Sequence, residues 1–163
     1  MKYLFYIIIL VIFNFEKSFS QDKDMIIFGN QIFESVRDID TIKFHKLMPE
    51  KDDLLGFVGS SSASNMEKQE FINKVVDGFP KYKDRMFRKL KLANEQGKNA
   101  GINWNKAVYE TTEIEDNSSI KTTIKPINIA IKFSYYNAIY ILRTKLVYYK
   151  KYYIVEKVVF EMI

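Results

Sequence analysis

The sequence contains no cysteine and a single histidine, and these two scarcities exclude several classes of function. Without cysteine the chain has no disulfide, thiolate metal site, iron–sulfur cluster or cysteine nucleophile. One histidine cannot build a multi-histidine metal centre. Six glycines and three prolines in 163 residues also exclude collagen-like and low-complexity architectures. With 47% hydrophobic residues, we expect one domain that is held by its core and contains no metal or cofactor.

The start of the chain has the pattern of a secretory signal peptide. Lys2 precedes an unbroken apolar run of eleven residues, Tyr3 to Phe13. Ser18 and Ser20 place small residues three and one positions before Gln21. This pattern predicts cleavage after Ser20.

A membrane anchor is the alternative interpretation of the apolar run, but a membrane span needs about 20 apolar residues. We therefore predict a signal peptide at 1–20 and a single domain at 21–163, exported to the periplasm or the extracellular space, with no membrane span after cleavage. Cleavage would lower the net charge from +5 to +4. This modest charge on an exported chain does not favour nucleic-acid binding.

The first part of the mature chain has helical periodicity. Apolar side chains recur at helical spacing between Asp24 and Arg37. Asp40 is a candidate N-cap for a short helix from Thr41 to about Met48. Pro49 should end that helix, because the residue before a proline avoids the helical region.

A further helical pattern covers 66–95, with Asn65 as the predicted N-cap and Gly97 as the predicted C-cap. Gly78 and Pro80 should kink this helix or divide it into two. The second half of the pattern is basic, and we favour a solvated outer face over a binding patch for these residues: Lys81, Lys83, Arg85, Arg88, Lys89 and Lys91.

After Gly101 the periodicity changes to that of strands, with short connections at 136–137 and 150–151 that predict an antiparallel meander. The predicted inward sets are Ile102, Trp104, Val108 and Ile114; Ile127, Ile129, Ile131, Phe133 and Tyr135; Ala138, Tyr140, Leu142, Leu146 and Tyr148; and Tyr152, Ile154, Val158, Phe160 and Met162. The ring of Trp104 should pack beneath the helices. The fold class is therefore α+β, with N-terminal helices packed on a curved antiparallel sheet of about four strands.

This order of elements resembles the nuclear transport factor 2-like, cystatin-like cone fold. The segment Gly101-Ile102-Asn103-Trp104 resembles a GI(D/N)W signature of small, uncharacterised exported bacterial proteins with that fold. The text from Tyr140 to Val155 resembles their closing hairpin, although Lys151 stands where Gly is frequent and Tyr152 where Trp is frequent. The resemblance covers about residues 24–163. It implies a cone-like domain and transfers no catalytic residue.

Cone folds of this kind enclose a pocket between sheet and helices, so polar residues at inward positions are candidates for a site. Glu156 lies between Ile154 and Val158, where a buried carboxylate would have a raised pKa. The alternatives are a bulge that turns Glu156 outward, or an ion pair with Arg143 or Lys145. The candidate pocket residues are Glu156, Tyr140, Tyr148, Tyr152 and Trp104.

Seven tyrosines cluster around the two predicted turns: Tyr135, Tyr136, Tyr140, Tyr148, Tyr149, Tyr152 and Tyr153. Inward tyrosines could line the pocket, and outward ones could form an interaction surface or a homodimer through the sheet. Cross-strand aromatic pairs that only stabilise the sheet are the simplest interpretation.

Two polar groups near the N-terminus carry weaker indications. His45 could form an acid–base pair with Asp38 or Asp40, although a surface histidine is the simpler interpretation. The acidic group Glu50, Asp52 and Asp53 lacks the spacing of a calcium loop.

The leading functional hypothesis is an exported, non-enzymatic binding module for a small ligand or an envelope protein. One alternative is an isomerase- or dehydratase-like enzyme on the same fold, with Glu156 or the His45 region as the base. Another is a structural envelope protein that pairs through its sheet.

Overall fold

The computed structural model describes residues 23–60, 64–115 and 126–162, and the predicted signal peptide lies outside them. Helices precede strands in these ranges, so the α+β class is confirmed. After a helix at 23–38 come α2 (Thr41–Leu47), α3 (Lys51–Gly59), α4 (Asn65–Asn99) and a 3₁₀ turn, η1 (Trp104–Lys106). The strands are β1 (Val108–Ile114), β2 (Ile127–Tyr135), β3 (Ala138–Tyr149), β4 (Lys151–Ile154) and β5 (Val159–Met162). Among the described helices, none has the length and apolar character needed to cross a membrane.

The first two helices are joined by one tight turn. Helix 23–38 ends where Ile39 takes a left-handed φ of 51°, and the amide of Asp40 then donates to the carbonyl of Ser35 at 3.1 Å. The Asp40 carboxylate accepts from the amide of Lys43 at 2.9 Å. Asp40 is therefore the N-cap of α2, and α2 ends just before Met48 and Pro49, both as predicted.

Helix α3 is an addition to the predicted elements. It begins at the acidic group, where the Asp53 carboxylate accepts from the backbone amide of Glu50 at 3.0 Å. Acidic residues stabilise a helix N-terminus, because they satisfy its free amides and complement its dipole. Asp52 and Asp53 lie in the first turn of α3, so the acidic group has a structural role there.

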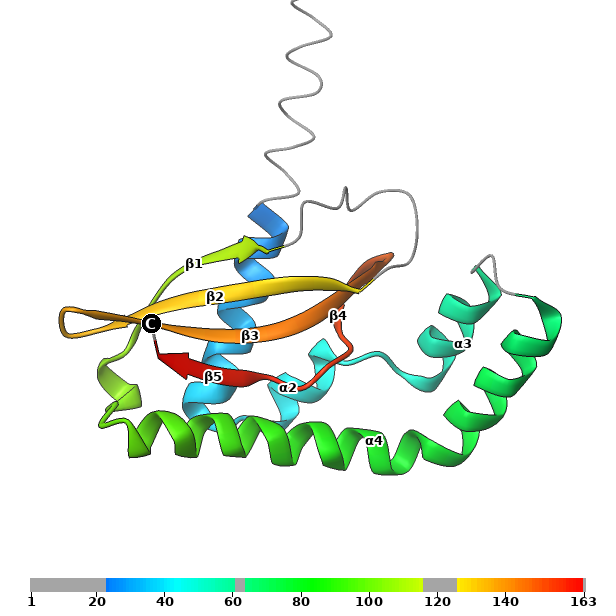
Figure 1. Ribbon diagram of the computed structural model, residues 1–163, viewed down its shortest axis with the longest axis horizontal. Helices are drawn as coiled ribbons and strands as arrows, with labels where there is room; N and C mark the ends of the chain where they lie inside the picture. The colour runs from blue at the N-terminus through cyan, green and yellow to red at the C-terminus, as the bar shows by residue number, and fades with distance from the viewer. Residues whose placement is uncertain (1–22, 61–63, 116–125, 163) are drawn as a thin grey trace, which may run out of the picture.

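Helix α4 is a single helix, and both predicted caps need correction. Its N-cap is Ser64, which forms a capping box with Glu67, one residue earlier than predicted. Gly78 and Pro80 lie within the helix, whose axis bends toward α3 in Figure 1. At its C-terminus the left-handed residue is Gly101, with φ 83°, and Gly97 is inside the last turns.

The sheet is antiparallel and open, with the strand order β1-β2-β3-β4, and β5 also pairs with β3. β4 and β5 occupy the same edge of β3, opposite 146–149 and 140–143. The single fourth strand predicted from Tyr152 to Met162 is therefore two strands. Between them residues 155–158 leave the ladder.

The predicted alternation is confirmed in β2 and only in part in β1, where Ile114 packs against the core as predicted but Val108 does not. Ile127, Ile129, Ile131 and Phe133 are all buried, whereas Val108 is 58% exposed. The register of β1 on β2 shifts by one residue between 109 and 111, and this bulge reverses which side chains face inward. Thr112 is consequently buried, although it is absent from the predicted inward set.

The main core lies between one sheet face and the helices 23–38, α2 and α4 (Figure 1). Its largest fully buried side chains include Phe33, Phe44, Phe133, Leu90 and Leu142. A second, smaller cluster lies on the opposite face of the β3–β4 hairpin.

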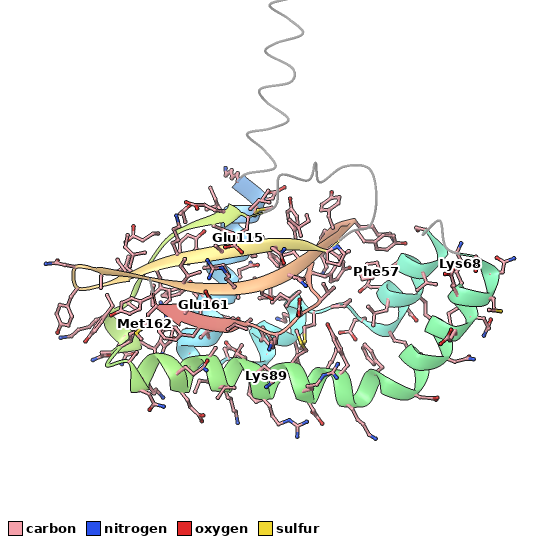
Figure 2. The ribbon with its side chains drawn as sticks, in the orientation of Figure 1. Phe57, Lys68, Lys89, Glu115, Glu161 and Met162 are labelled. Atoms are coloured by element: carbon pink, nitrogen blue, oxygen red, sulfur yellow. The ribbon has the colours of Figure 1, made fainter. Side chains whose placement is uncertain are left out.

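Helix α3 covers that second cluster. The Phe57 ring contacts Tyr149 and Tyr153 with centroids 5.1 and 5.7 Å away, and Figure 2 shows Phe57 directed from α3 toward the end of the hairpin. Burial, together with the carboxylate of Asp53, raises the pKa of Tyr153 to about 12. The sheet is thus covered by helices on both faces at this end and on one face elsewhere.

Candidate functional site

Two of the five candidate pocket residues belong to the packed core. Trp104 is 4% exposed, as expected for a ring beneath the helices, and its indole N–H donates to the carbonyl of Asn94 at 2.9 Å. The indole stacks on Phe133 at 5.2 Å between centroids. Tyr140 stacks on Phe133 at 5.6 Å and on Phe160 at 6.0 Å. Aromatic rings therefore occupy the space between sheet and helices around these two residues.

Glu156 lies in the segment between β4 and β5, where its backbone carbonyl accepts from the hydroxyl of Thr144 at 2.8 Å. Its carboxylate is 2.8 Å from the ammonium of Lys145, and the two side chains are 45% and 43% exposed. The sequence left three arrangements open for Glu156. The structure shows Glu156 turned outward in the segment between two strands, where it pairs with Lys145 of β3.

The remaining two candidates, Tyr148 and Tyr152, lie together. They face each other across β3 and β4, with ring centroids 5.1 Å apart and planes at 67°. Tyr152 is buried against Phe28 of the N-terminal helix, whereas Tyr148 is 47% exposed. Both line an open hollow of about 500 Å³.

This hollow lies between helix 23–38, α2 and the β3–β4 hairpin. Its apolar lining consists of the two tyrosines and Ile27, Phe28 and Leu47. Ile27 is 48% exposed, so two large apolar side chains at the hollow are open to solvent. Four lysines also line this hollow: Lys43 and Lys46 on α2, and Lys150 and Lys151 at the hairpin turn. We call it the basic hollow.

The other polar groups of the basic hollow are Asp24, Gln31 and Glu34. The ammonium of Lys43 is 3.4 Å from the carboxylate of Glu34, with both side chains in solvent. Four lysines against two carboxylates leave an excess of positive charge at the hollow.

The other candidate acid–base group is not assembled. His45 packs edge-on against Phe87 with centroids 6.3 Å apart. The Nε and Nη2 atoms of Arg37 donate to the Asp38 carboxylate at 2.7 and 2.9 Å, and this hydrogen bonding lowers the pKa of the Asp38 carboxyl. Asp40 caps α2. Each aspartate that the sequence offered to His45 is therefore held by another group.

The described residues contain no group of three or more histidine, aspartate or glutamate side chains that could hold a metal. The exposed part of the sheet face opposite the core instead carries ion pairs. Lys132 pairs with Glu113 at 2.7 Å, and Arg143 pairs with Glu115 at 2.6 Å and with Glu161. Figure 2 labels Glu115 and Glu161 on this face.

The lysines of the basic hollow could not be grouped from the sequence. Lys43 and Lys46 are about a hundred positions from Lys150 and Lys151, so only the fold brings them together. The one available signal is the Lys150-Lys151 pair beside Tyr148 and Tyr152, which the sequence pattern identifies only as a short connection between strands.

Comparison of the chain with protein families, with curated proteins and with solved structures gives no match.

Proposed function

We propose that the chain is an exported, non-enzymatic binding module and that the basic hollow is its site for a small ligand. The observation that carries this proposal is the exposure of Tyr148 and Ile27, at 47% and 48%, on the wall of a hollow of about 500 Å³. Small-molecule sites have volumes of about 300–1,000 Å³ and combine an apolar lining with a few polar groups. The basic hollow has both properties.

The proposal includes the nuclear transport factor 2-like family as the origin of the fold. Helices followed by a curved antiparallel sheet support it at the level of class. In a cone with an open interior, the ligand would lie between sheet and helices. Here Phe33, Trp104 and Phe133 pack against one another in that interior, which favours the rim as the binding site.

Native mass spectrometry of the protein purified from its own cell envelope tests the proposal. We expect a chain that begins at Gln21 and carries a bound small molecule, detected as additional mass on the folded protein. Tyr148→Ser should abolish that mass by removing the exposed aromatic wall. Tyr136→Ser is the matched control, because Tyr136 is a 75% exposed tyrosine of the other hairpin turn and lies outside the hollow. A bound mass that survives Tyr148→Ser contradicts the proposed site, and an unprocessed chain contradicts export with cleavage.

A further inference from the structure

We infer that the ligand of the basic hollow is a small amphiphile, an apolar chain or ring that carries one anionic group. This inference rests on the proposed function and adds the chemical class of the ligand. It follows from three properties of the basic hollow: the net charge of its lining, the weak contacts that its lysines make, and its exposed apolar wall.

The charge of the rim favours an anion. Only two carboxylates, Asp24 and Glu34, accompany the four lysines of the hollow. Glu34 neutralises Lys43 through an exposed contact of 3.4 Å, and such surface pairs are weak. A carboxylate, sulfonate or phosphate group in the hollow would therefore meet a positive potential, whereas an ammonium group would be repelled.

The lysines are available to an anion at little cost. Lys46 is exposed and makes no ion pair with any described residue. The ammonium groups of Lys150 and Lys151 lie 5.2 and 5.0 Å from the ring centroids of Tyr149 and Tyr153. Both rings belong to the second cluster, on the opposite face of the hairpin from Tyr148 and Tyr152, so the two ammonium groups must turn across the hairpin edge to reach a bound anion. Cation–π contacts at exposed sites are weak and a lysine has a flexible four-carbon stem, so this rearrangement is inexpensive.

The hairpin turn holds one of these lysines in an unfavourable conformation. Lys150 has φ 62°, in the left-handed region that glycine and asparagine adopt most easily. Strained positions of this kind are found preferentially at functional sites. A lysine at this position supplies a positive charge to the lining of the hollow that glycine would not supply.

The apolar half of the ligand has its own surface. Ile27 and Tyr148 form exposed walls, and Phe28, Leu47 and Tyr152 lie beneath them with 9, 7 and 5% exposure. An acyl chain or an aromatic ring that covers Ile27 and Tyr148 would bury apolar surface that is now hydrated. The hollow thus offers an apolar wall and an anion-attracting rim within one site.

Calorimetric titration with three ligands of equal chain length tests the inference: decanoate, decanol and decyltrimethylammonium, each below its micellar concentration. We expect decanoate to bind at least about tenfold more tightly than decanol, and decyltrimethylammonium more weakly still. Added salt should weaken only the decanoate interaction, because screening acts on the charged group.

Three variants locate the interaction. Lys46→Glu and Lys151→Glu should each weaken decanoate binding by about tenfold and leave decanol binding unchanged. Lys81→Glu is the matched control, since Lys81 is an exposed lysine of α4 that does not line the hollow. Tyr148→Ser should weaken decanoate and decanol alike, whereas Tyr148→Phe should bind both as well as the wild type.

The outcomes separate the two proposals. Equal binding of decanoate and decanol, both lost in Tyr148→Ser, would retain the site and overturn the anionic class. Equal weakening by Lys46→Glu and Lys81→Glu would also overturn it, since net charge alone would then explain the effect. If none of the three ligands binds, but the protein binds phosphatidylglycerol vesicles in a way that depends on the hollow lysines, the small amphiphile is overturned in favour of a membrane surface. If every hollow variant still carries the ligand that native mass spectrometry detects on the protein from its own cell envelope, the proposed function itself is overturned.

Discussion

The indole of Trp104 lies so close to Gly97 that a Cβ atom on residue 97 would be 2.3 Å from Cζ2 of the ring. The turn after α4 produces this contact. The amide of Ile102 donates to the carbonyl of Gly97 at 3.0 Å and that of Gly101 to the carbonyl of Lys98 at 2.9 Å, which is the Schellman arrangement. The chain therefore reverses over the last turns of the helix, and Trp104 covers Gly97.

Gly97→Ala should destabilise the protein by about 1–3 kcal/mol, because the indole is packed against Phe33 and Phe133 and cannot yield. This loss would outweigh the gain of about 1 kcal/mol that alanine normally gives inside a helix. Gly78→Ala is the control in the same helix, since a Cβ there would meet nothing within 4 Å. It should stabilise the protein. Urea unfolding of the two variants checks the opposite signs, and a stabilised Gly97→Ala protein would disprove the contact.

Lys150→Gly should stabilise the folded protein by about 1 kcal/mol, because glycine adopts a φ of 62° without the steric penalty of a side chain. The same change should weaken decanoate binding, since it removes a lysine of the basic hollow. Lys151→Gly, in the extended strand β4, should weaken binding and also destabilise the protein. Thermal unfolding and calorimetry together check this pair. A Lys150→Gly protein that is less stable than the wild type would contradict the assigned turn.

The stability of the protein should fall between pH 10 and 12. Burial raises the pKa of Tyr82 from 10.0 to about 12, and its hydroxyl donates to the carbonyl of Ile154 at 3.2 Å. A group whose pKa is raised by folding stabilises the fold fully below its unfolded pKa. That contribution is lost as the pH rises toward the folded pKa.

Tyr82→Phe removes this titration. Its unfolding free energy should be lower than that of the wild type at neutral pH, because the hydrogen bond to Ile154 is lost, and should fall less steeply above pH 10. Denaturant titrations across this pH range provide the measurement. Identical slopes for the two proteins would show that Tyr82 is accessible to water in the folded state.

The ion pair of Glu156 and Lys145 should contribute less than about 1 kcal/mol to stability, because the Glu156 side chain is 45% exposed and that of Lys145 is 43% exposed. A double-mutant cycle with Glu156→Gln and Lys145→Gln isolates the coupling between them. Glu156→Gln should also leave decanoate binding unchanged, since Glu156 does not line the hollow. A strong loss of ligand in this variant would return Glu156 to the candidate site.

Local sequence signals predicted the parts of the fold that local physics decides. Asp40 caps α2 because a carboxylate at that position satisfies a free amide, and this depends only on neighbouring residues. The alternation of β2 was equally clear, because four apolar residues at period 2 fix which face is buried.

Errors arose where tertiary structure interrupts a pattern. The bulge after Tyr109 exposes Val108, and the break after Ile154 carries Glu156 out of the inward set. Neither interruption has a glycine or proline to mark it. Helix α3 was missed because its apolar face, formed by Leu54 and Phe57, is short and packs on outward tyrosines, for which the sequence suggests cross-strand pairs or an interaction surface with another molecule.

The division of the last strand has a consequence for behaviour at high concentration. A long flat edge strand offers a row of free amides and carbonyls to another molecule, and this is a common route to β-aggregation. Here the edge of β3 is covered by two strands of four residues each, β4 and β5. Residues 155–158 separate them, with the charged Glu156 and Lys157 at the centre of the interruption. This edge therefore presents no continuous template for the addition of a further strand, and β1 is left as the longer edge of the sheet at which such pairing could occur.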